Sequence, residues 1–553
     1  MARERRQSGS RVRAHVATIA RDVGSLLAME SGLMAASVLV AAAFGEWYVA
    51  TAFVVASGLT GIVGFGARWA FDLAPEPRMK HGMVIAASGW LLTALFGALP
   101  FFFAAHLVPA EVATGFVPAG ATYDHSSLRY FANPLHAVFE SMSGWTGSGL
   151  TMAVHEPSLP RGIQWWRSLI QWVGGVGVIV LTVSILSRPG SGSYALYRSE
   201  TREAKIHPSV VSTVRTVWKL FVGYTAISVC LLFVGIALSE YGARLPLWEV
   251  GWQALNHAMT GLSTGGFSVT DNSIATYDSP LIEVVLLPVM TLGAIAFPVH
   301  YAVLADRDLR PLVSDLQTRW LFVLFVVGVV GLSIQNVVSI PVAADAFDRA
   351  GAWLGLGPVF GPLAADAVRD STFQWISALS CTGFQSAPVG RWAAGGKLLL
   401  SGAMILGGAA GSTVGGIKII RGYTIARGIK WQFDRVFLPA SAVVGIRIDG
   451  RRLDREEMER EFSEAAIVTL LWLVVLAASS LVLVNVAGPA FSYADALFEV
   501  ASAQGNVGLS TGITGPAMPP VAEAMFVLNM WVGRLEIIPI LVFARSLLYG
   551  LEP

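Results

Sequence analysis

Four short glycine-bearing segments recur along this 553-residue chain at nearly constant spacing. Their last glycines, Gly149, Gly266, Gly383 and Gly508, are separated by 117, 117 and 125 residues. Each of these glycines is followed by a large apolar residue, Leu or Phe. A repeat this regular predicts one structural unit copied four times around an axis, with the four loops meeting on that axis.

The sequence around these segments is too apolar for a soluble protein. Hydrophobic residues make up 54% of the chain and charged residues 14%, whereas soluble domains carry about 25% charged residues. Crossing a bilayer takes about 20 mostly apolar residues. Ten runs meet that requirement, near 24–45, 47–69, 83–106, 163–187, 217–239, 280–303, 319–341, 394–427, 463–487 and 521–547. We therefore expect an all-α polytopic membrane protein.

The distribution of Lys and Arg sets the orientation of these spans. Basic residues are concentrated in the N-terminus and in every second connection, which the positive-inside rule assigns to the cytoplasm. The four glycine segments all lie in the other connections and therefore face outside. The first apolar run has no small-residue cleavage site, so we expect a retained span and not a signal peptide.

The same topology fixes the relation between the repeats. Two full spans separate each glycine segment from the next, so the repeats are parallel around an axis along the membrane normal; inverted repeats would need an odd number of spans between copies. Shorter, moderately apolar stretches precede the glycines, near 132–146, 248–263, 370–381 and 491–505. We interpret them as re-entrant half-helices. The predicted units are an N-terminal two-span addition at 1–80 and pore repeats at 81–190, 191–305, 306–461 and 462–553.

A polar residue accompanies every copy of the repeat. Glu140, His257, Gln374 and Glu499 each lie nine residues before the aligned glycine. Such a coincidence in register indicates common geometry in the four copies. For the two carboxylates we expect hydrogen bonds that hold the loop backbone, in preference to a titrating role.

This arrangement suits a cation pathway. Non-helical backbone at membrane depth is tolerated only where it is buried or lines a cavity, and carbonyl oxygens around an axis can replace the hydration shell of an ion. Glycine reaches the required backbone conformations at low cost, and half-helices point their negative C-terminal ends at the loops. Oxygen ligands without a carboxylate cage favour a monovalent alkali cation over Ca²⁺ or Mg²⁺.

The candidate cation-contacting residues are those of the four segments. They are Thr146, Gly147, Ser148, Gly149, Ser263, Thr264, Gly265, Gly266, Ser380, Cys381, Thr382, Gly383, Asn506, Val507 and Gly508.

Five stretches of the chain resemble a known family. They are 139–146 (FESMSGWT), 166–177 (WRSLIQWVGGVG), 263–268 (STGGFS), 407–418 (GGAAGSTVGGIK) and 533–536 (GRLE). They are similar to the Trk/Ktr/HKT superfamily of potassium transporters, and most closely to its TrkH type, which also has two extra N-terminal spans.

The resemblance implies K⁺ as the transported ion, one pore per subunit, no covalently bound cofactor, and a multi-pass protein of the cell membrane. It also implies a homodimer controlled by a cytosolic, TrkA-like ring of nucleotide-binding regulatory subunits. In this family a serine in place of the first filter glycine accompanies Na⁺ transport, so the four glycines present here favour K⁺. Gly147 and Cys381 depart from the common pattern and leave the fine selectivity open, and the fourth loop is the least regular.

The run at 394–427 is unusually long and is interrupted by glycines that do not favour a helix, since each costs roughly 1 kcal/mol relative to alanine. We interpret 407–416 as an intramembrane loop below the filter that acts as a gate, as in the resembling family. The alternative is close helix packing through small residues. The gate candidates are Gly407, Gly408, Gly411, Ser412, Thr413, Gly415, Gly416, Lys418 and Arg534.

Arg534 is a charge inside the last apolar run, where charges are expensive and usually functional. We expect its guanidinium beneath the filter as an electrostatic barrier. The alternative is structural neutralisation, with the three candidate partners Glu536, Glu523 and Asp495. Lys418 and the nearby Arg421 are expected either to anchor the gate or to reach the lipid headgroups.

Other functional classes have less support. The nine histidines are scattered, and no HExxH or GxSxG pattern points to an intramembrane enzyme. A symporter coupled to H⁺ or Na⁺ stays open, although Glu30 and Asp271 are predicted near span ends. A net charge of +1 gives no reason to expect nucleic acid as a partner. The basic connections 188–219 and 428–461 are candidate docking surfaces for the cytosolic partner, or reflect topology alone.

Overall fold

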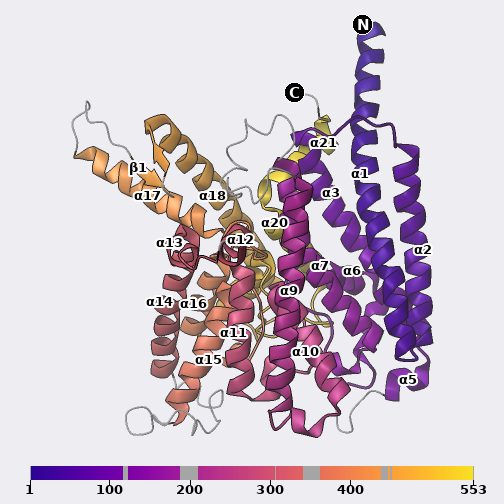
Figure 1. The fold of residues 1–553 in the computed structure, drawn as a ribbon, viewed down its shortest axis with the longest axis vertical. Coiled ribbons are helices and arrows are strands. Elements are labelled where there is room, and N and C mark those ends of the chain that lie inside the picture. The colour runs from indigo at the N-terminus through magenta and orange to yellow at the C-terminus, as the bar shows by residue number, and fades with distance from the viewer. Residues whose placement is uncertain are drawn as a thin grey trace.

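A computed structural model describes residues 2–115, 123–186, 210–305, 307–339, 362–437, 446–448 and 451–551. The described chain is a bundle of helices, with the N-terminus and the hairpin strand β1 at one end (Figure 1). The predicted all-α membrane fold is confirmed. The hairpin of β1 (Ile446–Ile448) and β2 (Arg451–Leu453) was not predicted.

The elements follow the predicted order along the chain. The first part contains α1 (Ala2–Ala43), α2 (Trp47–Ala70), α3 (Met79–Gly97), α4 (Leu99–Leu107), α5 (Ala110–Gly115), η1 (Ser127–Ala132), α6 (Pro134–Thr146), η2 (Glu156–Ser158) and α7 (Arg161–Leu186). The middle part contains α9 (Val210–Ala237), η4 (Gly242–Arg244), α10 (Leu247–Leu262), η5 (Ser273–Tyr277), α11 (Pro280–Ala294), α12 (Phe297–Ala305), α13 (Pro311–Ser314), α14 (Leu316–Ser339), α15 (Pro362–Leu379), η8 (Val389–Arg391) and α16 (Ala394–Ile405). The last part contains α17 (Ile419–Val436), α18 (Arg455–Val486), α19 (Tyr493–Gly505), α20 (Pro520–Leu535) and α21 (Ile537–Tyr549).

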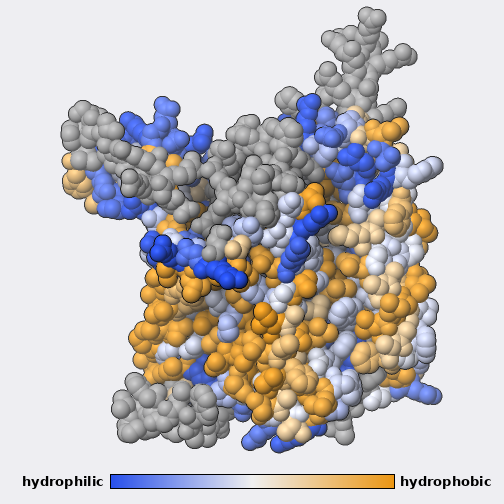
Figure 2. Space-filling view, in the orientation of Figure 1, coloured by the Kyte–Doolittle hydropathy of each residue, from blue (hydrophilic) through white to orange (hydrophobic). Residues whose placement is uncertain are grey.

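On the face shown in Figure 2, an apolar band lies between two more polar ends of the bundle. Large apolar side chains point outward from its outer helices, for example Ile62 on α2, Val234 on α9, Val326 on α14 and Leu470 on α18. Six helices of the described residues are long and apolar enough to cross a membrane, and two bent pairs add to them. Outward apolar residues on so many helices are what lipid contact requires.

The four predicted half-helices are confirmed as α6, α10, α15 and α19, each ending at a glycine segment. Their starts are set by local sequence. Pro134 occupies the first turn of α6, where its missing N–H is not needed, and the Asn133 side chain accepts from Leu135 N at 3.0 Å. Ser492 and Asp495 form a reciprocal capping box at the start of α19.

Three of the ten predicted spans are interrupted by a sharp bend or by a loop. The run 280–303 bends by 106° between α11 and α12, and 521–547 bends by 113° between α20 and α21. The run 394–427 is α16 and α17 joined by non-helical residues. Apolar composition specifies that a segment lies in the membrane, but it does not report where tertiary contacts replace helical hydrogen bonds.

The N-terminal addition requires a second correction. The apolar part of α1 begins at Ala14 and ends at Ala43, so Glu30 lies in the interior of a span and not near its end. The Glu30 side chain is fully buried. Glu30 Oε1, Ser141 Oγ and Trp145 Nε1 all lie within 2.8 Å of the point where a Cβ on Gly97 would lie. The carboxylate therefore faces the back of α6.

A small unit formed by α17, the hairpin and the start of α18 projects from the N-terminal end of the bundle (Figure 1). Trp431, Ile448, Leu453 and Met458 form its own apolar core. This unit contains most of the predicted docking surface at 428–461. Most of the other predicted surface, 188–219, and the predicted repeat boundary at 190 lie outside the described residues. The division into repeats stays a prediction.

Candidate functional site: a ring of four glycine loops

The four half-helices end in the same backbone conformation. The residue two positions before each aligned glycine is left-handed, with φ of 67° at Gly147, 53° at Thr264, 53° at Cys381 and 54° at Asn506. The aligned glycines are left-handed as well, with φ of 81°, 75°, 76° and 105°. Gly147 and Cys381 depart from the family pattern in their side chains, but their backbone conformation is the same as in the other loops. A non-glycine residue in this region costs about 1–3 kcal/mol.

One hydrogen bond closes all four turns. The backbone N–H of the residue before each aligned glycine donates to the carbonyl five residues earlier. The bonds are Ser148 N to Ser143 O (2.8 Å), Gly265 N to Thr260 O (2.8 Å), Thr382 N to Ser377 O (2.9 Å) and Val507 N to Ser502 O (2.9 Å). The fourth loop, which looked least regular in sequence, keeps the same turn.

The four loops close into a ring, which we call the glycine ring. A Cβ added to Gly508 would lie 2.5 Å from the carbonyl oxygen of Ser148. The same test on Gly149, Gly266 and Gly383 places the Cβ still closer to a carbonyl oxygen of the next loop. These carbonyl oxygens belong to Gly265, Thr382 and Val507, respectively. Each loop therefore contacts the next one, and the fourth loop contacts the first. The aligned positions require glycine because neighbouring backbone fills the space a side chain would need.

The polar residue nine positions upstream holds the segment that follows each glycine. Glu140 accepts from Thr151 Oγ1 (2.9 Å) and Met152 N (2.9 Å). His257 is 2.9 Å from Ser268 Oγ, and Gln374 Nε2 donates to Ser386 Oγ at 3.2 Å. The four residues thus act on equivalent positions, 11 or 12 residues downstream.

Glu499 makes the densest set of these contacts. Its carboxylate accepts from Ser510 Oγ (2.6 Å), Thr511 N (2.7 Å), Ile513 N (3.2 Å) and Thr514 Oγ1 (2.6 Å). The expectation that Glu140 and Glu499 hold loop backbone is confirmed.

Two ring-supporting residues were named in the sequence only as part of a motif. Arg167 on α7 pairs with Glu140 (2.7 Å) and donates to Ser268 O (2.8 Å). Gln171, one turn later, donates to Gly265 O (2.6 Å) and accepts from Phe267 N (3.0 Å). Arg167 links the first loop region to the second, and Gln171 ties α7 to the second loop. Their signal in the sequence was a charged and an amide side chain inside an apolar span.

The residues between α16 and α17 form a loop directly against the ring, as predicted for 407–416. The loop is closed by Gly407 N to Ile417 O (2.8 Å) and Ile419 N to Gly408 O (3.1 Å). These residues are not helical, so the alternative of close helix packing is wrong. We call this segment, 406–418, the central loop.

The central loop bonds to the break between α11 and α12. Thr413 N donates to Gly293 O (3.1 Å), and Phe297 N donates to Gly411 O (3.1 Å). It also contacts the ring itself, because Thr413 Oγ1 lies 2.9 Å from Thr264 Oγ1. A chain that is helical elsewhere thus satisfies its non-helical backbone groups by pairing one broken span with another.

Arg534 lies in the last turn of α20, on the side of the ring that the central loop occupies. Its Nη1 donates to Thr413 O (2.6 Å) and its Nη2 to Gly174 O (2.9 Å). The same Nη1 is 3.9 Å from the position of a Cβ on Gly147. The guanidinium therefore touches the central loop, α7 and the first glycine loop at once.

The three acidic residues proposed to neutralise Arg534 are engaged elsewhere. Glu536 pairs with Arg421 (2.5 Å), Glu523 with His136 (2.7 Å) and Asp495 with Lys397 (2.6 Å). Within the described part of the chain Arg534 has no carboxylate partner. The structural alternative for Arg534 is wrong in the form predicted, and its positive charge is held by carbonyl oxygens alone.

Lys418 and Arg421 anchor the end of the central loop and do not reach for headgroups. Lys418 Nζ donates to the carbonyl of Val414, inside the loop. Arg421 is buried, and its pair with Glu536 ties the start of α17 to the break between α20 and α21. Of the two alternatives left open for these cations, these contacts favour anchoring of the loop.

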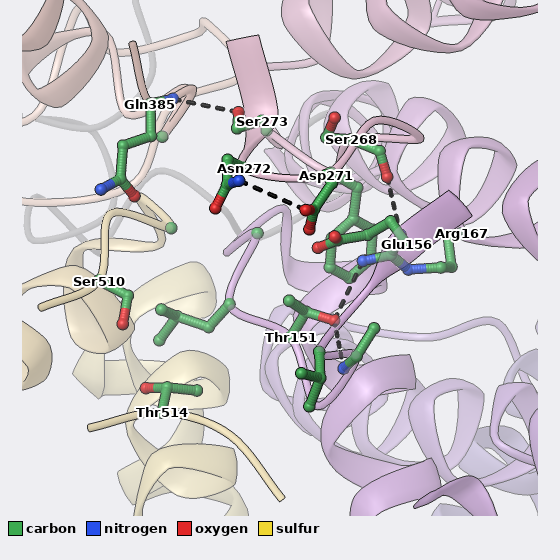
Figure 3. Close-up of a pocket in the computed structure, with 18 residues that line it drawn as sticks. Thr151, Glu156, Arg167, Ser268, Asp271, Asn272, Ser273, Gln385, Ser510 and Thr514 are labelled. Atoms are coloured by element: carbon green, nitrogen blue, oxygen red, sulfur yellow. Dashed lines mark hydrogen bonds between the residues drawn. The ribbon is translucent and has the colours of Figure 1, made fainter. Parts of the chain in front are cut away.

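A cavity of about 200 Å³ opens on the other side of the ring (Figure 3). All four aligned glycines line it, together with polar residues from all four loop regions and the carboxylates of Glu156 and Asp271. Burial raises the pKa of Glu156 to about 7; nearby Arg167 opposes this shift, and Asp271 and Glu140 add to it. The cavity gives solvent access to the ring from the face opposite the N-terminus.

Comparison with known proteins shows what this chain is similar to. A family model described as TrkH: Cation transport protein matches residues 81–549. An uncharacterized cation transporter of Methanocaldococcus jannaschii is 29% identical over 85% of this chain and 84% of its own. The Trk system potassium uptake protein TrkH of Escherichia coli K12 is 28% identical over 96% of this chain and 98% of its own. The crystal structure of the potassium transporter TrkH from Vibrio parahaemolyticus matches with a TM-score of 0.74 at 22% identity, covering 97% and 99% of the two chains; that likeness concerns the fold.

Proposed function

The chain belongs to the TrkH family of cation transport proteins, and from this premise we propose that it takes up potassium ions across the plasma membrane. Relatives that match over nearly the whole chain are named potassium uptake proteins of the Trk system. The single observation that carries the proposal is the closed glycine ring, in which four loops from distant parts of the chain share one turn and one axis.

We propose that the ring is the selectivity filter. The carbonyl oxygens of the residues before each glycine lie at the contacts between neighbouring loops, where a dehydrated cation can replace water by carbonyl oxygens. The C-terminal ends of α6, α10, α15 and α19 point at the same place and favour positive charge. The side chains at the left-handed position differ among the loops, but ligation by backbone does not depend on them.

The central loop and Arg534 form the proposed gate. They lie on the cytoplasmic side of the ring, and the contact between Thr413 and Thr264 couples the loop to the second glycine segment. The positive charge of Arg534, without a carboxylate partner in the described residues, opposes a cation leaving the ring. Backbone hydrogen bonds join the loop to α11 and α12, and Arg534 joins it to α20.

A symporter coupled to H⁺ is the second candidate, and Glu30 favours it. Glu30 is fully buried inside a span, where the Trp145 indole is its neighbour and no cation pairs with it among the described residues, and a charge at this depth is costly. A carboxyl that binds a proton there suits coupling. Glu30→Gln separates the two functions: it abolishes flux driven by a pH gradient in a symporter and leaves a passive pathway unchanged.

The relatives' names place them in a Trk system, which supports a cytosolic regulatory partner; homodimerisation is proposed on the resemblance alone. The proposed docking surface for a TrkA-like subunit is the unit of α17, the hairpin and α18. At the end of α17, the apolar residues Phe433, Val436 and the following Phe437 are exposed beside the basic Lys430 and Arg435. A surface with both characters suits a protein partner.

Flux from the purified protein in liposomes tests the function. We expect K⁺ and Rb⁺ to pass at least about tenfold faster than Na⁺, which corresponds to a difference of about 1.4 kcal/mol. We expect the rate to be indifferent to an imposed pH gradient. Equal K⁺ and Na⁺ rates would contradict the selectivity, and K⁺ movement driven by a pH gradient alone would establish the symporter.

A further inference from the structure

The cavity outside the ring is lined by two carboxylates, Glu156 and Asp271, that have no role in the proposed filter. All four aligned glycines line this cavity, so a cation that approaches the ring from this side must pass through it. Figure 3 shows Glu156 and Asp271 on its wall, near Arg167. Ser510 and Thr514 line the opposite side and are neutral.

The charges on this wall do not cancel. Arg167 is almost fully buried and pairs with Glu140 at 2.7 Å, so these two neutralise one another. Glu156 and Asp271 have no ion pair within the described residues. When both are ionised, the four charged groups sum to two negative charges, and protonation of Glu156 reduces the sum to one.

The groups facing Glu156 come from every element around it. Arg167 belongs to α7, Glu140 to α6, and Asp271 to the turn that follows the second glycine loop. Tyr123 lies on the remaining side, influenced by the charges of Glu156 and Asp271, with its ring 5.4 Å from that of His155. Glu156 itself lies in the 3₁₀ turn η2, outside the membrane-spanning helices.

We propose that Glu156 and Asp271 collect cations at the entrance of the ring and that external acidification weakens this collection by removing the charge of Glu156. The inference rests on the proposed function and adds the residues that set the apparent affinity for the external ion. Cavities lined by one sign of charge raise the local concentration of the opposite ion. The interaction is screened by salt over about 10 Å at 0.1 M ionic strength.

The direction of the pH effect follows from the protonation state. The pKa of Glu156 is about 7, so at higher external pH the cavity carries both negative charges and the KM for the external cation is low. As the pH falls through this value one charge is lost and KM rises, by roughly threefold to tenfold at low ionic strength. The maximal rate at saturating cation changes little, because the ring is occupied in either case.

The test is uptake of radioactive Rb⁺ into cells that lack other potassium uptake systems, with the full chain and external pH between about 5.5 and about 8.5. Glu156→Gln is expected to give a high KM at every pH. Glu156→Asp keeps the charge and is expected to keep the low KM at high pH. The matched control is Glu111→Gln on α5, an exposed carboxylate that does not line the cavity, for which KM and its pH profile are expected to stay unchanged.

Asp271→Asn supplies a readout that a structural role would not move. Because the charge of Asp271 raises the pKa of Glu156, its removal is expected to shift the midpoint of the KM profile to lower pH, besides raising KM itself. Glu156→Gln with the KM and pH profile of the parent would overturn the inference, and so would a change confined to the maximal rate. Absence of any Rb⁺ uptake by the parent chain would instead contradict the proposed function.

Discussion

The glycine ring and the central loop are in contact, but the ring is built from four similar copies and the layer that contains the central loop is not. In the ring, each of the four loops has the same left-handed positions, the same turn bond and the same contact to the next loop. In the layer beneath, one contributor is an unbroken helix, α7, whereas the spans after the second and fourth loops bend sharply and the span after the third is interrupted by the central loop. The repeated part of the structure is the proposed filter, and the part that departs from the repeat is the proposed gate.

The asymmetry has a physical basis in backbone hydrogen bonds. A broken span leaves N–H and C=O groups without helical partners, and these must be satisfied inside the protein. The central loop satisfies them by bonding to the break of α11 and α12, while Arg534 covers carbonyls of the loop and of α7. In this layer the central loop and Arg534 satisfy the backbone groups, and there is no fourfold repeat of these contacts among the described residues.

The largest expected effect is at the ring. Gly383→Ala places a methyl group against Val507 O at a φ of 76°, where a non-glycine residue costs about 1–3 kcal/mol before the clash is counted. We expect loss of K⁺ flux in liposomes. Gly402→Ala on α16 is the matched control, since a Cβ there meets nothing within 4 Å, and it should keep the flux. Normal flux in Gly383→Ala would show that the ring is not on the ion path.

The next effect is at the proposed gate. Arg534→Ala removes the positive charge and the bonds to Thr413 and Gly174, so we expect K⁺ flux to rise by roughly threefold to tenfold, the effect of about 1 kcal/mol. Arg534→Lys retains the charge and should change the rate less. Shortening the central loop should likewise raise flux and weaken regulation. If neither change alters the rate, the layer beneath the ring is structural.

A smaller effect separates the loops from one another. Glu499→Gln replaces an acceptor of several hydrogen bonds by a group with a single acceptor oxygen, leaving buried donors unpaired at about 1–3 kcal/mol each. Gln374→Ala in the third loop removes one bond of 3.2 Å and should cost about 1 kcal/mol. Thermal unfolding in detergent measures both. Equal losses would mean that the carboxylate does not hold the fourth loop.

The smallest effect concerns the left-handed residue two positions before the aligned glycine, which is Cys381 in the third loop. Cys381→Gly matches the first loop, where Gly147 adopts this conformation, and should relieve about 1 kcal/mol of strain with K⁺ flux unchanged. Cys230→Gly is the control on the other cysteine, exposed in the middle of α9, and should destabilise by about 1 kcal/mol. A fall in flux in Cys381→Gly would assign the thiol a role that the backbone argument does not require.

Much of the fold was readable because membranes restrict what apolar sequence can do. The spans, the four half-helices, the common side of the loops and the interruption at 407–416 all came from hydrophobic length, charge distribution and glycine spacing. Glu30 was misplaced because an apolar window does not show how far α1 extends beyond its most hydrophobic part. Arg167 and Gln171 lay in a predicted span, but nothing in the sequence indicated that they face the second glycine loop.

The sequence by itself determined that four equivalent loops exist and that they enter from one side, since a period of about 117 residues and the basic connections are local properties of the chain. Only the tertiary structure decided that the loops close on one another, that Arg534 lies under the first loop without a carboxylate partner in the described residues, and that three spans break. The reason is that these features depend on contacts between residues more than 100 positions apart, such as Thr264 with Thr413. The sequence repeat specifies the four similar loops, and tertiary packing specifies how the spans that follow them differ.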